Sequence, residues 1–160
     1  MRSYVARRVI ALTPPIIVIN LMPAAVTTIL CIVRRVTFGQ NFSVVSTQGE
    51  VQIARTAVAG AGAAPAELVT TQTEGGDSVN VFKAYPEVGW GTTQPTASTT
   101  DIPLTAPMNV LTGYERAYAL NDPDAPKIRG TTAFSGCCMR IVLPGSSFTW
   151  VVEIAWTEMG

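Results

Sequence analysis

The chain has 160 residues with 11 basic and 11 acidic side chains, so no excess of positive charge favours nucleic-acid binding. Histidine is absent, which removes the commonest general base and the commonest zinc ligand. The length predicts a single domain. Because only 14% of residues are charged and 48% are apolar, we expect the domain to bury part of its surface against other subunits.

An apolar run with basic flanks spans residues 9–33. Pro14, Pro15 and Pro23 interrupt it, and because each proline disrupts helical hydrogen bonding we expect extended chain rather than a membrane helix. A secretory signal peptide is the alternative, since the start is basic and small residues follow the apolar middle. We predict that residues 1–25 form an arm that packs on the domain or on a neighbouring subunit. The expected contact residues, including two arginines that follow the arm, are Ile16, Ile17, Val18, Ile19, Leu21, Met22, Arg34 and Arg35.

Short apolar segments with period-two alternation follow, and turn residues separate them. The expected strands are residues 26–38, 42–45, 51–56, 68–73, 79–85 and 127–131, with 110–120 either a strand or a short helix. Residues 42–45 and 51–56 are expected to form a hairpin. Residues 57–66 and the threonine-rich residues 92–101 read as loops, and a loop as long as the second is typically functional or mobile.

The C-terminal stretch has two apolar runs around a Pro-Gly-Ser-Ser turn, and it predicts a hairpin that closes the domain. In the second run Phe148, Trp150 and Trp156 share one face of a strand. These aromatic residues are expected to lie on the core or on a partner. The whole pattern predicts an all-β fold: an antiparallel jelly-roll-like sandwich or Greek-key barrel over residues 26–160, with an extended N-terminal arm.

Candidate chemistry is sparse. The Gly60-Ala61-Gly62 sequence lacks the third glycine of a dinucleotide fingerprint, and no helix is expected after it. A solvated turn is the preferred interpretation of residues 121–126, with calcium bound by Glu115, Asp122 and Asp124 as the alternative. The three cysteines are Cys31, Cys137 and Cys138. We expect buried free thiols, with a Cys137–Cys138 disulfide or a redox role as the alternative, and no enzyme activity, cofactor or metal.

Three segments carry a resemblance to a known family. They are ILCIVRRVTF at residues 29–38, VQIART at 51–56 and WVVEIAWTE at 150–158. In this order of strands the chain resembles the small β-rich capsid decoration (cement) proteins of tailed bacteriophages. The first 25 residues depart from that family. The resemblance implies a jelly-roll-like trimer on the exterior of the virion head that binds the major capsid protein and stabilises the shell, without contact to nucleic acid or membrane.

Two other functions stay open at this point. The first is a carbohydrate- or receptor-binding β module of a tail fibre or secreted protein, in which Tyr85, Trp90 and the threonine-rich loop form a stacking platform. The second is a minor capsid or tail-tube component. For the decoration protein, we expect that deletion of residues 1–25 abolishes binding to heads and leaves the domain folded.

Overall fold

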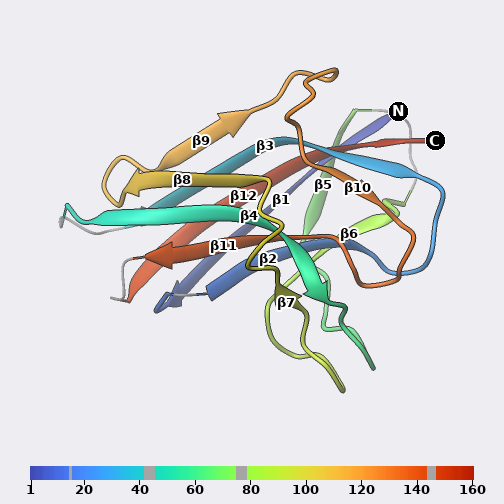
Figure 1. Ribbon diagram of the computed structural model, residues 1–160, viewed down its shortest axis with the longest axis horizontal. Coiled ribbons are helices and arrows are strands. Elements are labelled where there is room, and N and C mark those ends of the chain that lie inside the picture. The colour runs from blue at the N-terminus through green and yellow to red at the C-terminus, as the bar shows by residue number, and fades with distance from the viewer. Residues whose placement is uncertain (15, 42–45, 75–78, 144–146) are drawn as a thin grey trace.

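The computed structural model describes residues 1–14, 16–41, 46–74, 79–143 and 147–160 (Figure 1). Two antiparallel sheets pack face to face, and the described residues contain no helix. Accordingly, nothing helical in these ranges is long and apolar enough to cross a membrane. The predicted all-β class and sandwich are thus confirmed.

Sheet A has the order β10-β3-β12-β1-β5, and β9 pairs with β3. Its strands are β1 (Arg2–Leu12), β3 (Leu30–Asn41), β5 (Thr70–Glu74), β9 (Tyr114–Ala117), β10 (Lys127–Arg129) and β12 (Phe148–Met159). Sheet B has the order β6-β2-β11-β4-β7, and β8 pairs with β4. Its strands are β2 (Ile16–Pro23), β4 (Gln48–Val58), β6 (Phe82–Tyr85), β7 (Thr96–Ala97), β8 (Leu104–Asn109) and β11 (Cys137–Leu143). Figure 1 shows the two layers.

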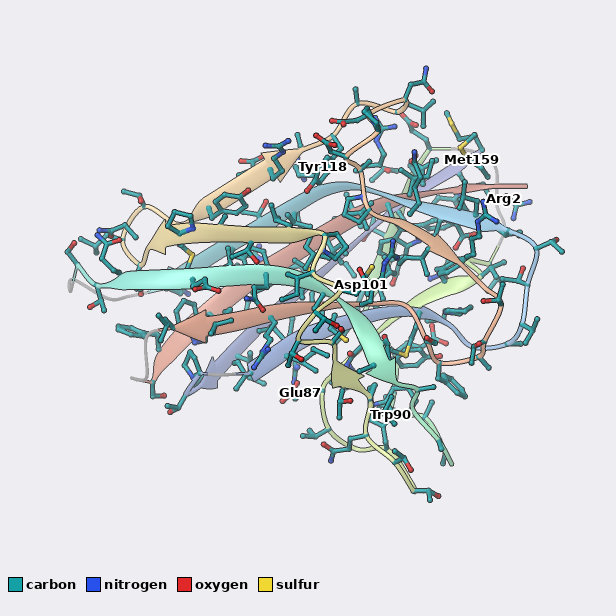
Figure 2. All side chains as sticks on the ribbon, in the orientation of Figure 1. Arg2, Glu87, Trp90, Asp101, Tyr118 and Met159 are labelled. Atoms are coloured by element: carbon teal, nitrogen blue, oxygen red, sulfur yellow. The ribbon has the colours of Figure 1, made fainter. Side chains whose placement is uncertain are left out.

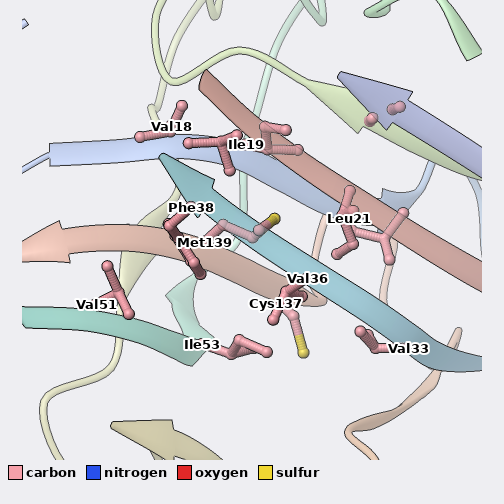
Figure 3. Close-up of a cluster of buried hydrophobic side chains, with 14 of the residues drawn as sticks. Val18, Ile19, Leu21, Val33, Val36, Phe38, Val51, Ile53, Cys137 and Met139 are labelled. Carbon is pink, nitrogen blue, oxygen red and sulfur yellow. The ribbon is translucent and has the colours of Figure 1, made fainter. Parts of the chain in front are cut away.

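The core fills the space between the sheets, and apolar side chains from both layers meet there (Figure 3). On β12, Trp150 and Trp156 are fully buried, and each contributes roughly 4–6 kcal/mol of apolar burial as an upper estimate. Tyr4 of β1 stacks on Trp156 with ring centroids 5.7 Å apart. Phe148 is half-buried and meets Trp150 edge-on at 5.5 Å. The aromatic face of β12 therefore points into the core.

Residues 1–25 do not form an arm outside the domain. Residues 2–12 and 16–23 are β1 and β2, and each is an interior strand of its sheet. β1 pairs along its whole length with β12, from Arg2 opposite Glu158 to Leu12 opposite Phe148. The β-branched run at the start of β2 is extended chain, as expected, but it belongs to the sandwich rather than to an appendage.

The predicted hairpin at the C-terminus is wrong. β11 pairs with β2 and β4 in sheet B, whereas β12 pairs with β1 and β3 in sheet A. The turn between them lies mostly outside the described residues, because residues 144–146 are not described. The other expected hairpin, of residues 42–45 with 51–56, falls partly outside the described residues, because 42–45 are not described; residues 51–56 belong to β4 in sheet B. Turn residues predict that the chain reverses, but they do not distinguish a hairpin from a crossing between sheets.

Candidate functional site

The outer face of sheet A is not covered by any other segment among the described residues. We call it the open face, and its side chains are half-buried or exposed. It consists of Val5, Arg7, Val9 and Ala11 of β1; Thr149, Val151, Glu153 and Ala155 of β12; Arg35, Thr37, Gly39 and Asn41 of β3; and Glu115 of β9. At its middle Val9 lies opposite Val151, which lies opposite Gly39. Val9 is 52% exposed although it is an interior-strand valine.

Charges on the open face balance. Arg7 and Glu153 are opposite each other in the register, and Glu153 is also ion-paired with Arg35. Glu115 adds a second carboxylate beside Thr37. Arg35 is exposed, so its ion pair contributes about 0–1 kcal/mol to folding. The open face is consequently close to neutral, with small aliphatic side chains between charged ones.

Arg34, the other arginine predicted as a contact residue, lies apart from the open face. It is half-buried and lines a cavity of about 270 Å³ together with Ser3, Glu74 and Thr157. Ser3 donates a hydrogen bond to the Glu74 carboxylate at 3.1 Å. Within the described residues the Arg34 Nε atom is buried without a hydrogen-bond partner. Arg34 and Arg35 are therefore separated in environment although they are adjacent in sequence.

The chain itself covers part of the outer face of sheet B, whereas Thr105 and Pro107 of β8 on the same face are exposed. Residues 86–101, which we call the cover, lie along this face together with loop residues around 60–65 and 134 (Figure 2). Asn20 points outward from β2 and is fully buried because its amide nitrogen bonds the Pro86 carbonyl at 3.2 Å. Cys138 points outward from β11 and is also fully buried. These two side chains are thus sealed from solvent.

An aromatic cluster fastens the cover to sheet B. The rings of Tyr85, Trp90 and Phe134 meet edge-on with centroids 5.2–6.1 Å apart, and Met22 of β2 lies beneath them. A Cβ on Gly60 would lie 2.4 Å from the Trp90 ring, so this position requires glycine. Tyr85 is 3% and Trp90 8% exposed. The stacking platform predicted for these two residues is therefore wrong, because their rings are used inside the protein.

Most of the predicted contact residues on β2 are buried inside the protein. Val18, Ile19 and Leu21 are fully buried in the main core, and Met22 is fully buried in the aromatic cluster. Side chains that already pack within the chain cannot supply a contact surface, so the prediction that these four residues form an interface is wrong. The apolar run predicted as an interface is apolar mainly because β2 is an interior strand covered on both faces.

The two remaining residues of that run, Ile16 and Ile17, are half-buried and line a groove on the outer face of sheet B. The groove has a volume of about 390 Å³. Residues 94–97 and Thr99 of the cover form one side, and Arg140 of β11 and Glu87 complete it. Sequence reasoning identified the isoleucines and the threonine-rich loop separately, and the structure brings them together.

Two charged residues inside the sandwich were missed by sequence reasoning. Arg8 of β1 donates to the Val18 carbonyl at 2.7 Å and forms an ion pair with Glu87, so it connects sheet A with sheet B. Burial lowers the pKa of Arg8. Glu158 of β12 is 3% exposed and accepts backbone hydrogen bonds from Val81 at 2.9 Å and Phe82 at 2.7 Å. The alternation along the strand could have identified Arg8. Tyr4, Ala6 and Arg8 are alternate residues of β1, so all three side chains point to the same, inward face.

All three cysteines are buried and free. Burial raises the pKa of Cys137 to about 11 and that of Cys138 to about 12, so both thiols are protonated near neutral pH. In the described ranges no group of three or more Cys, Asp or Glu side chains is arranged to hold a metal ion. The Asp122 carboxylate instead accepts the Asp124 backbone N–H at 2.9 Å, as in an ordinary Asx turn.

Comparison of the chain with known protein families, with curated proteins and with solved structures finds no match in any of the three.

Proposed function

We propose that this chain is a non-enzymatic virion protein that binds the outside of a bacteriophage head as a trimer and stabilises the capsid shell. The partner in this proposal is the major capsid protein. The single observation that supports it best is the open face, where an interior-strand valine is 52% exposed at the centre of the sheet. On sheet B, by contrast, outward-pointing residues such as Asn20 and Met22 are buried by the chain's own residues.

The composition of the open face suits a contact with another folded protein. Its middle holds Val9, Val151 and Gly39, and charged residues of both signs surround them. This arrangement is typical of interfaces, which have an apolar centre and a polar rim. The side chains project from hydrogen-bonded interior strands, so binding immobilises little backbone and its entropic cost is small.

The size of the open face favours a multivalent assembly. The face spans about seven residues on each of β1, β12 and β3 and four on β9. With about 3.4 Å per residue and about 4.8 Å between strands, its area is roughly 400 Å². A standard interface takes roughly 800 Å² from each partner, so one such face alone would bind weakly. A trimer presents three faces to a shell of repeated subunits, and the linked contacts then raise the overall affinity.

The strand order also supports the resemblance to decoration proteins. Sheet A contains four adjacent strands in the order β1-β12-β3-β9, and sheet B contains four in the order β2-β11-β4-β8. Among these eight strands, successive strands lie in opposite sheets, except that β4 and β8 pair with each other in sheet B. We propose that the sandwich is a jelly roll, because eight strands in two four-stranded sheets with this alternation are typical of that fold.

The test is co-sedimentation of the purified full chain with expanded, undecorated heads of the phage whose genome encodes it. We expect saturable binding at a fixed number of copies per head and a higher melting temperature of the decorated heads. Mature heads that already carry the protein are the control, since their sites are occupied. If the protein stays in the supernatant at every ratio, the proposal fails.

A further inference from the structure

The groove on the outer face of sheet B has walls that the fold holds in place. The cover is attached to β4 through β7, where Thr56 lies opposite Ala97, and through a hydrogen bond from the Ser98 N–H to the Arg55 carbonyl at 2.7 Å. The Ser98 hydroxyl also accepts the backbone N–H of Asp101 at 2.9 Å. The threonine-rich segment is therefore a fixed wall rather than a free loop, and the groove is preformed.

The floor of the groove is aliphatic. Ile16 and Ile17 of β2 line it, although Ile16 also packs against the main core. Arg140 lies beside Ile17 because the two are paired in the register between β11 and β2. Thr96 and Thr99 contribute to the opposite wall. The groove thus combines an apolar floor with hydroxyl groups on its rim, which is the usual composition of a site for a small ligand or a short peptide.

The charge of the groove is set by Arg140. The other charged residue, Glu87, is already paired with Arg8, and both of these side chains are largely buried. Among the residues that the structure describes, Arg140 has no carboxylate within ion-pair distance. Arg140 is half-buried, so its guanidinium is held beside the isoleucines without a neutralising partner. The site therefore has one cation that is complementary to an acidic group.

We propose that this groove binds a short acidic peptide segment, whose carboxylate pairs with Arg140 and whose neighbouring aliphatic side chain lies on Ile16 and Ile17. Thr96 and Thr99 line the groove, and in this proposal their hydroxyls bond the peptide backbone. A volume of about 390 Å³ is at the lower end of the range for small-ligand sites, so it takes a segment of a few residues rather than a folded surface. The groove is on the sheet opposite the open face, and this inference does not depend on binding to a head.

The test uses the full chain with ¹³C-labelled isoleucine methyl groups, titrated with N-acetyl-Leu-Glu-amide as the probe. We expect saturable shifts of the Ile16 and Ile17 methyl signals. N-acetyl-Leu-Gln-amide has the same shape without the charge, and we expect it to bind about tenfold to a hundredfold more weakly, because one charge-assisted hydrogen-bonded pair is lost.

Arg140→Gln should weaken binding of the glutamate probe by the same factor, while Arg140→Lys, which keeps the charge but not the planar fork, should weaken it less. The matched control is Arg129→Gln, an exposed arginine of β10 outside both the groove and the open face, which should leave probe binding unchanged. An unchanged methyl spectrum without probe shows that each variant is folded. Equal binding of the two probes, full binding by Arg140→Gln, or no saturable shift would each overturn the proposal.

Discussion

The two outer faces of the sandwich differ in how far the chain buries their side chains. On sheet B, outward-pointing Asn20, Met22 and Cys138 are fully buried by the cover and the aromatic cluster. On sheet A, outward-pointing Val9 is 52% exposed, and the residues around it are half-buried or exposed. The same alternation along a strand thus produces a closed face where the chain folds back and an open face where it does not.

This difference explains the unusual composition of the chain. A domain with 14% charged residues has few charged side chains to place on its surface. On sheet B, loops of the same chain bury part of the outer face. Sheet A has Arg7, Arg35, Glu115 and Glu153 spread over the open face. In the proposed function, this mixed charged and aliphatic surface is the one that contacts the partner.

Deletion of residues 1–25 removes one interior strand from each sheet, so it should destroy both faces together. We expect the truncated chain to lack a cooperative unfolding transition, because β12 and β11 each lose a pairing partner and the core loses Tyr4, Ile19 and Leu21. Near-UV circular dichroism during a urea titration measures this. A cooperative transition in the truncated chain would restore the earlier expectation of a separable arm.

Trp90→Ala should loosen the cover selectively. We expect a loss of about 3 kcal/mol in the free energy of unfolding, because a buried ring that contacts Tyr85 and Phe134 leaves a cavity. Urea unfolding followed by fluorescence gives this value. The matched control is Val88→Ala, an exposed residue of the same segment, for which the change should be within about 0.5 kcal/mol.

The same variant tests where the cover lies. Cys138 is on the covered face, whereas Cys31 and Cys137 are in the core between the sheets. In Trp90→Ala we therefore expect a thiol reagent to label Cys138 before the other two cysteines, as mapped by mass spectrometry. Labelling of all three at one rate would show that the variant opens globally and that the cover is not a separate unit.

The free energy of unfolding should fall as pH rises above about 9. The unfolded thiols ionise near pH 9, whereas the folded pKa of Cys137 is about 11 and that of Cys138 about 12, so protonated thiols stabilise the fold below pH 9 and this contribution is lost as pH rises through the folded values. At pH 10.5 the loss is about 2 kcal/mol for each thiol. Urea titrations across this range should show a smaller pH dependence for Cys138→Ala. An equal dependence in both proteins would assign the effect to other groups.

Alternation alone predicted the parts of the fold that depend on local pattern. The face of β12 that holds Trp150 and Trp156 was evident because period-two patterning determines which side chains share a face. β3 shows where this fails. A register shift at Ala155 and Trp156 leaves Arg34 as an extra residue, so Val33 and Val36 both point inward. Such a bulge changes the phase of a strand and has no reliable signature in one sequence.

The candidate site was harder to predict than the fold, because it depends on which sheet each strand joins. Val9 is exposed because no described segment covers the outer face of sheet A. Trp90 is buried because it packs against residues distant in sequence, such as Phe134. Val9 stands between Arg8 and Ile10, and Trp90 stands between Gly89 and Gly91, and neither local sequence indicates whether the residue is covered. Only the path of residues 86–101 across sheet B distinguishes them.

The most direct test of the account compares two valine substitutions in head binding. Val9→Glu places a carboxylate at the centre of the open face, and Val79→Glu places one at a valine that is 76% exposed elsewhere. Both variants should keep wild-type stability within about 0.5 kcal/mol, because neither valine belongs to the core. We predict that Val9→Glu loses binding to undecorated heads while Val79→Glu retains it. Full head binding by Val9→Glu would contradict the assignment of the open face as the contact surface.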